Sequence, residues 1–202
     1  MKYKQNTIDE IVKSLIKGKI VCFPTDTVHA LAVDSSNSMA LSSLFNSKRR
    51  PLNKPLSIFI DDIKNYVHLM IITEKQLSFI SQVQFLPLTF IVQRKNTLHN
   101  DKILRFLGKK MAFRLPNHPI AKGIIGKFNG AIASTSLNIS GEKNIENIDD
   151  IPSELNIDTI IFDDNLKNNH HSTIVEFKND DLILVRDGVY DFKQLKSLYD
   201  AI

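Results

Sequence analysis

The sequence predicts a three-layer α/β (α+β) fold in which helices flank a mixed β-sheet. Segments with the apolar spacing of helices alternate with short apolar segments typical of strands. The strand segments near the C-terminus follow one another at hairpin-like spacing, which favours a mixed rather than a purely parallel sheet. We find no internal repeat, low-complexity segment or linker in the 202 residues, so we expect one domain over residues 1–202.

Five segments have the apolar spacing of amphipathic helices. The first is the best defined, because Thr7 and Glu10 form a capping-box pattern at its start and Gly18 follows its end. The second is expected to place Met39 toward the interior, together with other apolar residues, and to deliver Lys48 to its C-terminal end. The predicted helices cover residues 7–17, 37–48 (capped by Asn37 or Ser38), 73–83 (capped by Thr73), 118–128 (after Asn117) and 191–202.

Eight apolar segments rich in β-branched and aromatic residues are predicted to be strands. The first of them ends at Pro24 and contains the single cysteine, Cys22. We interpret Cys22 as buried and inert because its neighbours are apolar, and one cysteine excludes an internal disulfide. The predicted strands cover residues 19–23, 55–60, 88–94, 111–116, 131–135, 158–163, 172–177 and 182–186.

Charge and composition exclude several classes of protein. The formal net charge of +4 and the pI of about 9.1 permit a nucleotide or nucleic-acid partner without requiring one. The N-terminus lacks the apolar core of a signal peptide, and no apolar run approaches the roughly 20 residues of a membrane helix. We therefore expect a cytoplasmic protein with no membrane partner.

Familiar catalytic motifs are missing from the sequence. It contains no Walker loop, no G-x-G-x-x-G and no G-x-S-x-G elbow, so nothing indicates a covalent catalyst. We interpret His170 and His171 as solvated loop residues, because no third ligand stands at metal-binding spacing. No metal site is assigned to the protein's own side chains.

Four polar motifs follow predicted strands, where α/β sheets build ligand sites. They are FPTDT, FRLP, STSLNISG and VRDG, and a cationic stretch, SKRRPLNKPLSIFI, runs into another strand. Taken singly, each is also typical of a turn, a helix cap or a solvated loop. The combination and its order are more specific. The full set is Pro24-Thr25-Asp26-Thr27, Lys48-x-Arg50-Pro51-x-x-Lys54-Pro55-Leu56, Arg114-x-Pro116-x-His118-Pro119, Ser134-Thr135-Ser136-x-Asn138-x-Ser140-Gly141, Ser172-Thr173-Ile174-Val175 and Arg186-x-Gly188.

This ordered set resembles the YrdC-like threonylcarbamoyl-AMP synthase family in its single-domain form, from about residue 8 to about residue 190. The resemblance implies a twisted mixed sheet with helices on both sides and a concave, positively charged cavity. It also implies a nucleotidyltransferase that forms threonylcarbamoyl-AMP and pyrophosphate from L-threonine, bicarbonate and ATP. A separate transferase machinery would then modify an adenosine of tRNA to threonylcarbamoyladenosine.

The same resemblance implies roles for particular residues. Phosphate displacement depends mostly on positioning and charge, so no strong side-chain base is required, and Mg²⁺ would be carried mainly by the phosphates. Lys110 and Asn144 match family nucleotide contacts by spacing alone. The expected ATP-binding residues are Lys48, Arg50, Lys54, Lys110, Ser136, Asn138, Asn144 and Arg186, and the expected threonine-binding residues are Thr27, Arg114, Ser134 and Ser172.

The sequence departs from the family pattern in places. His29-Ala30-Leu31-Ala32 stands where Tyr-Gly-Leu-Gly is usual, and Phe59 stands where histidine or cysteine is frequent. We expect the threonine pocket to differ at Phe59.

Two alternatives remain open at this point. The same basic face could make the chain a module that binds double-stranded RNA or tRNA without catalysis, although no aromatic stacking platform is evident. A related enzyme class makes carbamoyl-adenylate from carbamoyl phosphate, but this chain lacks the zinc-finger and acylphosphatase modules of such proteins.

Overall fold

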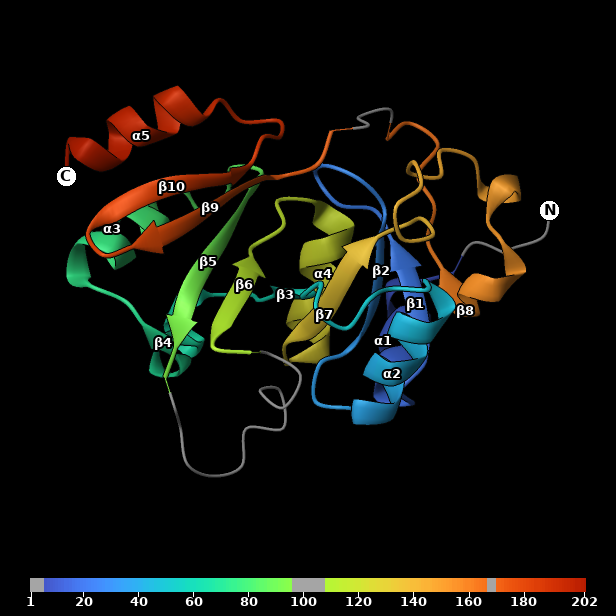
Figure 1. The fold of residues 1–202 in the computed structure, drawn as a ribbon. Helices are drawn as coiled ribbons and strands as arrows, with labels where there is room; N and C mark the ends of the chain where they lie inside the picture. The colour runs from blue at the N-terminus through green and yellow to red at the C-terminus, as the bar shows by residue number, and fades with distance from the viewer. Residues whose placement is uncertain (1–5, 96–107, 167–169) are drawn as a thin grey trace.

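The computed structural model describes residues 6–95, 108–166 and 170–202. Within these residues, strands from both ends of the chain join in one sheet, with helices on both of its faces (Figure 1). The strands are β1 (Ile20–Phe23), β2 (Ala30–Asp34), β3 (Ser57–Phe59), β4 (Met70–Ile71), β5 (Leu88–Arg94), β6 (Lys110–Arg114), β7 (Ile132–Ser136), β8 (Ile157–Ile160), β9 (Thr173–Lys178) and β10 (Asp181–Arg186).

The predicted mixed sheet is confirmed. Its strand order is β10-β9-β5-β6-β3-β7-β2-β1-β8, and β4 pairs with β5 beside this path. The pairs β1–β8, β3–β6 and β5–β9 are parallel, while the other ladders are antiparallel. The sheet is strongly twisted between its two ends (Figure 1).

The five predicted helices are all present in the described residues. The predicted capping box of Thr7 with Glu10 forms, and Thr73 caps the third helix as expected, in a capping box with Gln76. The helix predicted after Asn117 begins one residue later, with His118 as its N-cap. The α-helices are α1 (Ile8–Ile16), α2 (Ser38–Ser47), α3 (Glu74–Val83), α4 (Pro119–Phe128) and α5 (Phe192–Asp200), and short 3₁₀ turns cover Ile63–Asn65, Val67–Leu69, Ile148–Asp150 and Ser153–Leu155.

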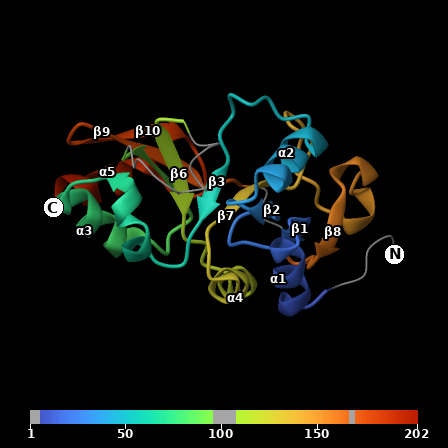
Figure 2. The ribbon, with the colours of Figure 1, turned by 90° about the horizontal axis from the view of Figure 1, so that it is seen from below.

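Helices cover both faces of the sheet, which makes the three layers (Figure 2). Helices α1 and α4 pack on one face, and α2, α3 and α5 contribute to the apolar cluster on the other. Alternation along β1 separates the two cores, because Cys22 belongs to one cluster and its neighbour Phe23 to the other. The predicted burial of Cys22 is confirmed, and burial raises the pKa of its thiol, so it stays protonated and inert.

Two expectations about local structure were wrong. Met39 is 78% exposed rather than inward, because it lies in the first turn of α2 on the side away from the core residues Leu41 and Leu44. The strands β2 and β4 were not predicted: nearly all residues of β2 are buried, so no alternation of polar and apolar side chains marks it, and β4 is only two residues long. Among the described residues, no helix has both the length and the apolar character needed to cross a membrane.

Candidate functional site

A cavity of about 320 Å³ lies on the same face of the sheet as α1 and α4, next to the part of that face that these helices cover. Its floor is made by alternate residues of neighbouring strands. Ser57 of β3 pairs with Ser134 of β7 on one side and with Ala112 of β6 on the other. The next strand, β5, places Ile91 opposite Ala112. Three of these four side chains are small, and this leaves room above the sheet for a ligand.

Phe59 joins the cavity to the core. It is two residues beyond Ser57, it is 4% exposed, and it belongs to the apolar cluster beneath α1 and α4 as well as to the cavity wall. Its ring lies 6.3 Å from that of Phe23, in a tilted arrangement. A bulky apolar ring therefore stands at the position where the sequence predicts a difference from the family pattern.

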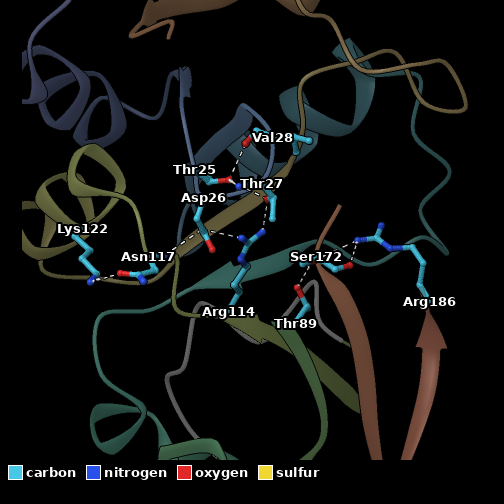
Figure 3. Close-up of polar contacts among 10 residues, drawn as sticks. All are labelled: Thr25, Asp26, Thr27, Val28, Thr89, Arg114, Asn117, Lys122, Ser172 and Arg186. Atoms are coloured by element: carbon cyan, nitrogen blue, oxygen red, sulfur yellow. Dashed lines mark hydrogen bonds and ion pairs between the residues drawn. The ribbon is translucent and has the colours of Figure 1, made fainter. Parts of the chain in front are cut away.

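Arg114, at the end of β6, is the most buried cation of the cavity wall, with 5% of its surface exposed. Its Nη1 donates to Thr27 Oγ1 at 2.7 Å and its Nη2 forms an ion pair with Asp26 Oδ1 at 2.7 Å (Figure 3). Its buried Nε has no hydrogen-bond partner among the described residues. Burial lowers the pKa of Arg114 and Asp26 opposes that shift, so the guanidinium stays charged.

The loop between β1 and β2 holds Asp26 and Thr27 in place. Thr25 Oγ1 donates to Val28 O at 2.7 Å and lies 3.1 Å from Thr27 Oγ1, which closes a tight turn (Figure 3). Asp26 Oδ1 also accepts from the backbone N–H of Asn117 at 3.1 Å. Through these contacts Thr25 and Asp26 fix the shape of the loop.

Ser172 and Arg186 lie together on the opposite wall. Arg186 Nη2 donates to Ser172 O at 2.8 Å, and Ser172 Oγ shares a hydrogen bond of 2.8 Å with Thr89 Oγ1 (Figure 3). Gly188 explains the spacing of the Arg-x-Gly motif, because a Cβ there would lie 2.4 Å from backbone atoms of residues 171–173. The glycine lets the segment after β10 pack closely enough for Arg186 to reach Ser172.

Arg50 and Lys54 line the cavity from the loop between α2 and β3. Arg50 is half-buried and donates through Nε to Lys54 O at 3.1 Å and through Nη2 to Pro55 O at 2.7 Å. Burial lowers the pKa of its guanidinium. Lys54 is exposed at the rim. Among the described residues that line the cavity, Arg50, Lys54, Arg114 and Arg186 are cationic and none is Asp or Glu.

Other predicted residues do not line this cavity. Lys48 is completely buried, and its ammonium is bonded to oxygen atoms of Ser136 and Asn138. Lys110 is exposed on β6 and pairs with Glu176 at 2.5 Å. Asn144 lies behind the wall, where its Nδ2 is 3.5 Å from His171 Nε2. Direct ligand contact by Lys48, Lys110, Asn138 or Asn144 stays a prediction.

Two histidines belong to the cavity wall. The interpretation of His171 as a solvated loop residue was wrong, since it is half-buried and lines the cavity; burial and the nearby arginines lower its pKa. His29 is 5% exposed, stacks on Phe162 with ring centroids 4.0 Å apart, and accepts from Asp163 N at 3.0 Å through Nε2. Burial lowers the pKa of His29 to about 4, so its ring is neutral at pH 7.

Apart from Ser134, the floor of the cavity was not assigned from the sequence. Ser57, Thr89 and Ala112 line it, but none carries charge. The available signal was a small or polar residue within each otherwise apolar strand, as in LSIFI, LTFIV and MAF. This pattern predicts a site only when the strand register, which brings these residues together, is known.

Comparison with known proteins agrees with this architecture. The family model of Sua5, YciO and YrdC proteins, described as telomere recombination, matches residues 13–188. A protein of Methanocaldococcus jannaschii named putative threonylcarbamoyl-AMP synthase is 29% identical over 199 residues, which cover 95% of this chain and 90% of that protein.

Solved structures share the fold. Sua5 of P. abyssi, crystallised with L-threonine, superposes with a TM-score of 0.81 at 24% identity; the match covers 95% of this chain but only 56% of the P. abyssi chain. YciO of E. coli superposes with a TM-score of 0.79 at 22% identity and 96% coverage of both chains. The resemblance seen in the ordered motifs is thereby confirmed, and the chain belongs to the Sua5, YciO and YrdC family.

Proposed function

We propose that this chain is an L-threonylcarbamoyladenylate synthase, an enzyme of the nucleotidyltransferase type. It joins L-threonine, bicarbonate and ATP to form threonylcarbamoyl-AMP and pyrophosphate. The name of the M. jannaschii relative, which matches nearly the full chain, supports this assignment, and so does the threonine complex of the P. abyssi structure. The observation that carries the proposal is a buried arginine in the wall of a cavity that has no lining carboxylate among the described residues.

The threonine end of the proposed site is the wall around Arg114. A guanidinium has five N–H donors, of which Thr27 and Asp26 each take one here and the Nε–H is buried, so one N–H on each of Nη1 and Nη2 remains for a carboxylate. Ser172 and Ser134 have hydroxyls on the same cavity and can bind the polar atoms of the amino acid. The ring of Phe59 restricts the space beside Arg114 and favours a short side chain such as that of threonine.

The nucleotide end is proposed to lie between Arg50, Lys54, Ser136 and Arg186. All four line the cavity, and three of them are cations that can bind phosphate oxygens. Among the described residues, no group of three or more His, Cys, Asp or Glu side chains could hold a metal ion. Mg²⁺ is proposed to be carried mainly by the phosphate oxygens, which suits its preference for a few strong oxygen ligands and water.

The chemistry follows from this arrangement. The neutral amine of threonine adds to the carbon of bicarbonate with loss of water, or to CO₂ with loss of a proton, and either route gives a carbamate. A carbamate oxygen then attacks the α-phosphorus of ATP, and pyrophosphate leaves as the P–O bond breaks. The cations stabilise the charge that develops on the leaving pyrophosphate, and alignment of the two substrates supplies most of the remaining acceleration.

The wider setting is proposed on the same basis. The product would supply a cytoplasmic transferase machinery that converts an adenosine of tRNA to threonylcarbamoyladenosine. One YrdC-like domain is proposed to cover residues 1–202. The alternative of a non-catalytic RNA-binding module is not favoured, because the relatives are named as synthases.

The direct test is synthesis of the adenylate. The protein is incubated with labelled bicarbonate, L-threonine, ATP and Mg²⁺, and pyrophosphate and the labelled adenylate are measured. Both should form together, and neither should form without threonine. A folded protein that produces neither would refute the proposal, and synthesis from carbamoyl phosphate in place of threonine and bicarbonate would favour the carbamoyl-adenylate class.

A further inference from the structure

We infer that Lys48 is a positioning residue of the nucleotide end: its ammonium fixes the shape of residues 136–142, which carry Ser136 into the cavity, and it does not itself contact phosphate. The effect on ATP rests on the proposed function. The hold of the Lys48 ammonium on residues 136–142, called the clamp below, is a property of the fold and can be tested without any measurement of activity.

The ammonium of Lys48 is enclosed by oxygen atoms. Nζ donates to Ser136 O at 2.5 Å, to Asn138 O at 2.5 Å and to Asn138 Oδ1 at 2.9 Å. An ammonium has three N–H bonds, so these contacts use its full donor capacity. The residue is 0% exposed and is absent from the cavity lining, although its neighbour Arg50 lines the cavity.

The loop that receives these bonds depends on Lys48 in a second way. The backbone N–H of Ser140 donates to Lys48 O at 2.9 Å, so both ends of the lysine bind the same loop. Asn138 extends the network, because its Oδ1 also accepts from Ser136 Oγ at 2.8 Å and its Nδ2 donates to Glu142 O at 2.7 Å. The Ser-x-Asn spacing of the motif is thereby explained by contacts within the loop.

The chemistry of the pocket around Nζ also argues for a clamp. Its acceptors are two backbone carbonyls and one amide oxygen, and none is a carboxylate. Burial, with Arg50 nearby, lowers the pKa of Lys48 to about 7, but three converging acceptors match the three hydrogens of the charged form. A phosphate contact would require the ammonium to leave three hydrogen bonds inside the protein, whereas Arg50 and Lys54 already face the cavity.

The first test is a double-mutant cycle with Lys48→Met, Asn138→Ala and the double variant, and with Lys64→Met as the exposed control. We expect Lys48→Met to lower the melting temperature by roughly 5–10 °C and to raise the KM for ATP about tenfold, with the dissociation constant of threonine within about twofold of wild type. The KM for ATP of the double variant should be within about twofold of that of the worse single variant, because both substitutions act through one loop. The inference is overturned if the two substitutions raise the KM for ATP by factors that multiply in the double variant. It is also overturned if threonine binding and ATP binding are weakened equally.

The second test uses the wild-type protein and remains informative if Lys48→Met does not fold. Lysine ammonium signals in ¹H–¹⁵N spectra are visible when hydrogen bonding slows exchange with water. One such signal, assigned to Lys48, should be present in the free protein and should stay unchanged when pyrophosphate and Mg²⁺ are added. A Lys48 ammonium that exchanges rapidly in the free protein, or that shifts strongly with pyrophosphate, would contradict the clamp. Because no adenylate is made in this test, its outcome is separate from that of the proposed function.

Discussion

Arg114 allows binding and stability to be separated by two substitutions. Arg114→Met removes the guanidinium and leaves the carboxylate of Asp26, whose side chain is 15% exposed, without its cation. Breaking a buried ion pair in this way costs about 3–5 kcal/mol of unfolding free energy. In a protein of this size we expect the melting temperature to fall by roughly 10 °C.

Combining Arg114→Met with Asp26→Asn should restore most of that stability, because the double variant buries no unpaired charge. It should not restore threonine binding. The guanidinium has one free N–H on each of Nη1 and Nη2 for the substrate carboxylate, and two charge-assisted bonds contribute about 3 kcal/mol or more. Loss of these bonds weakens threonine binding by a factor of roughly 100 or more.

Calorimetric titration with threonine and urea unfolding, both on wild type, the single variant and the double variant, distinguish the two effects. The reasoning is refuted if the double variant binds threonine as wild type does. It is also refuted if the double variant is no more stable than Arg114→Met, because the cost would then come from lost packing rather than from the stranded carboxylate.

Three further predictions concern the rest of the cavity wall. The pKa of His29 is lowered to about 4 from an ordinary value of 6.5. Between these two pH values the unfolded chain binds more protons than the folded one. The unfolding free energy should therefore fall by up to about 3 kcal/mol as pH drops from 6.5 to 4. Urea unfolding at several pH values checks this, and His29→Gln should remove that part of the slope. Arg50→Ala should weaken ATP binding by roughly 10- to 100-fold, measured by calorimetry. Arg49→Ala, which removes an exposed neighbouring cation, should keep the dissociation constant of ATP within about twofold of wild type. Equal effects of the two substitutions would show that Arg50 is an ordinary surface residue. Gly188→Ala should lower the unfolding free energy by about 2 kcal/mol or more, because its Cβ would lie 2.4 Å from backbone atoms; an unchanged thermal transition would show that the segment can move aside.

The helices were the most predictable part of the fold, because their signals are local. The capping box predicted at Thr7 depends on side chains three residues apart, and it forms; Thr73 caps its helix as predicted. The strand β2 gave no such signal, since it is buried on both faces. Met39 was misplaced because a helix of 10 residues contains too few turns to fix its buried side from sequence spacing alone.

The site was predictable where it depends on charge and order, and less so where it depends on register. Arg50, Arg114 and Arg186 come from distant parts of the chain and line one cavity, as the family resemblance of the ordered motifs implies. The floor residues Ser57 and Ala112 face each other only because β3 and β6 pair in one particular register. No local pattern in a single sequence determines that register.

Lys48, Arg49 and Arg50 show how backbone conformation assigns three adjacent cations to three environments. After α2, the N–H of Arg50 donates to Phe45 O and that of Arg49 to Asn46 O, which is the Schellman arrangement. Arg49 takes the left-handed position with a φ of 51°, although it is not glycine, and pairs with Glu154 at the surface.

This reversal of the chain directs Lys48 into the interior and Arg50 toward the cavity. Glycine at position 49 would relieve the left-handed strain, which is of the order of 1 kcal/mol, and would leave both neighbours in place. The charge of the basic stretch therefore has separate uses. Lys48 binds the loop of residues 136–142, Arg49 binds a surface carboxylate, and only Arg50 of the three faces the cavity where a phosphate is proposed to bind.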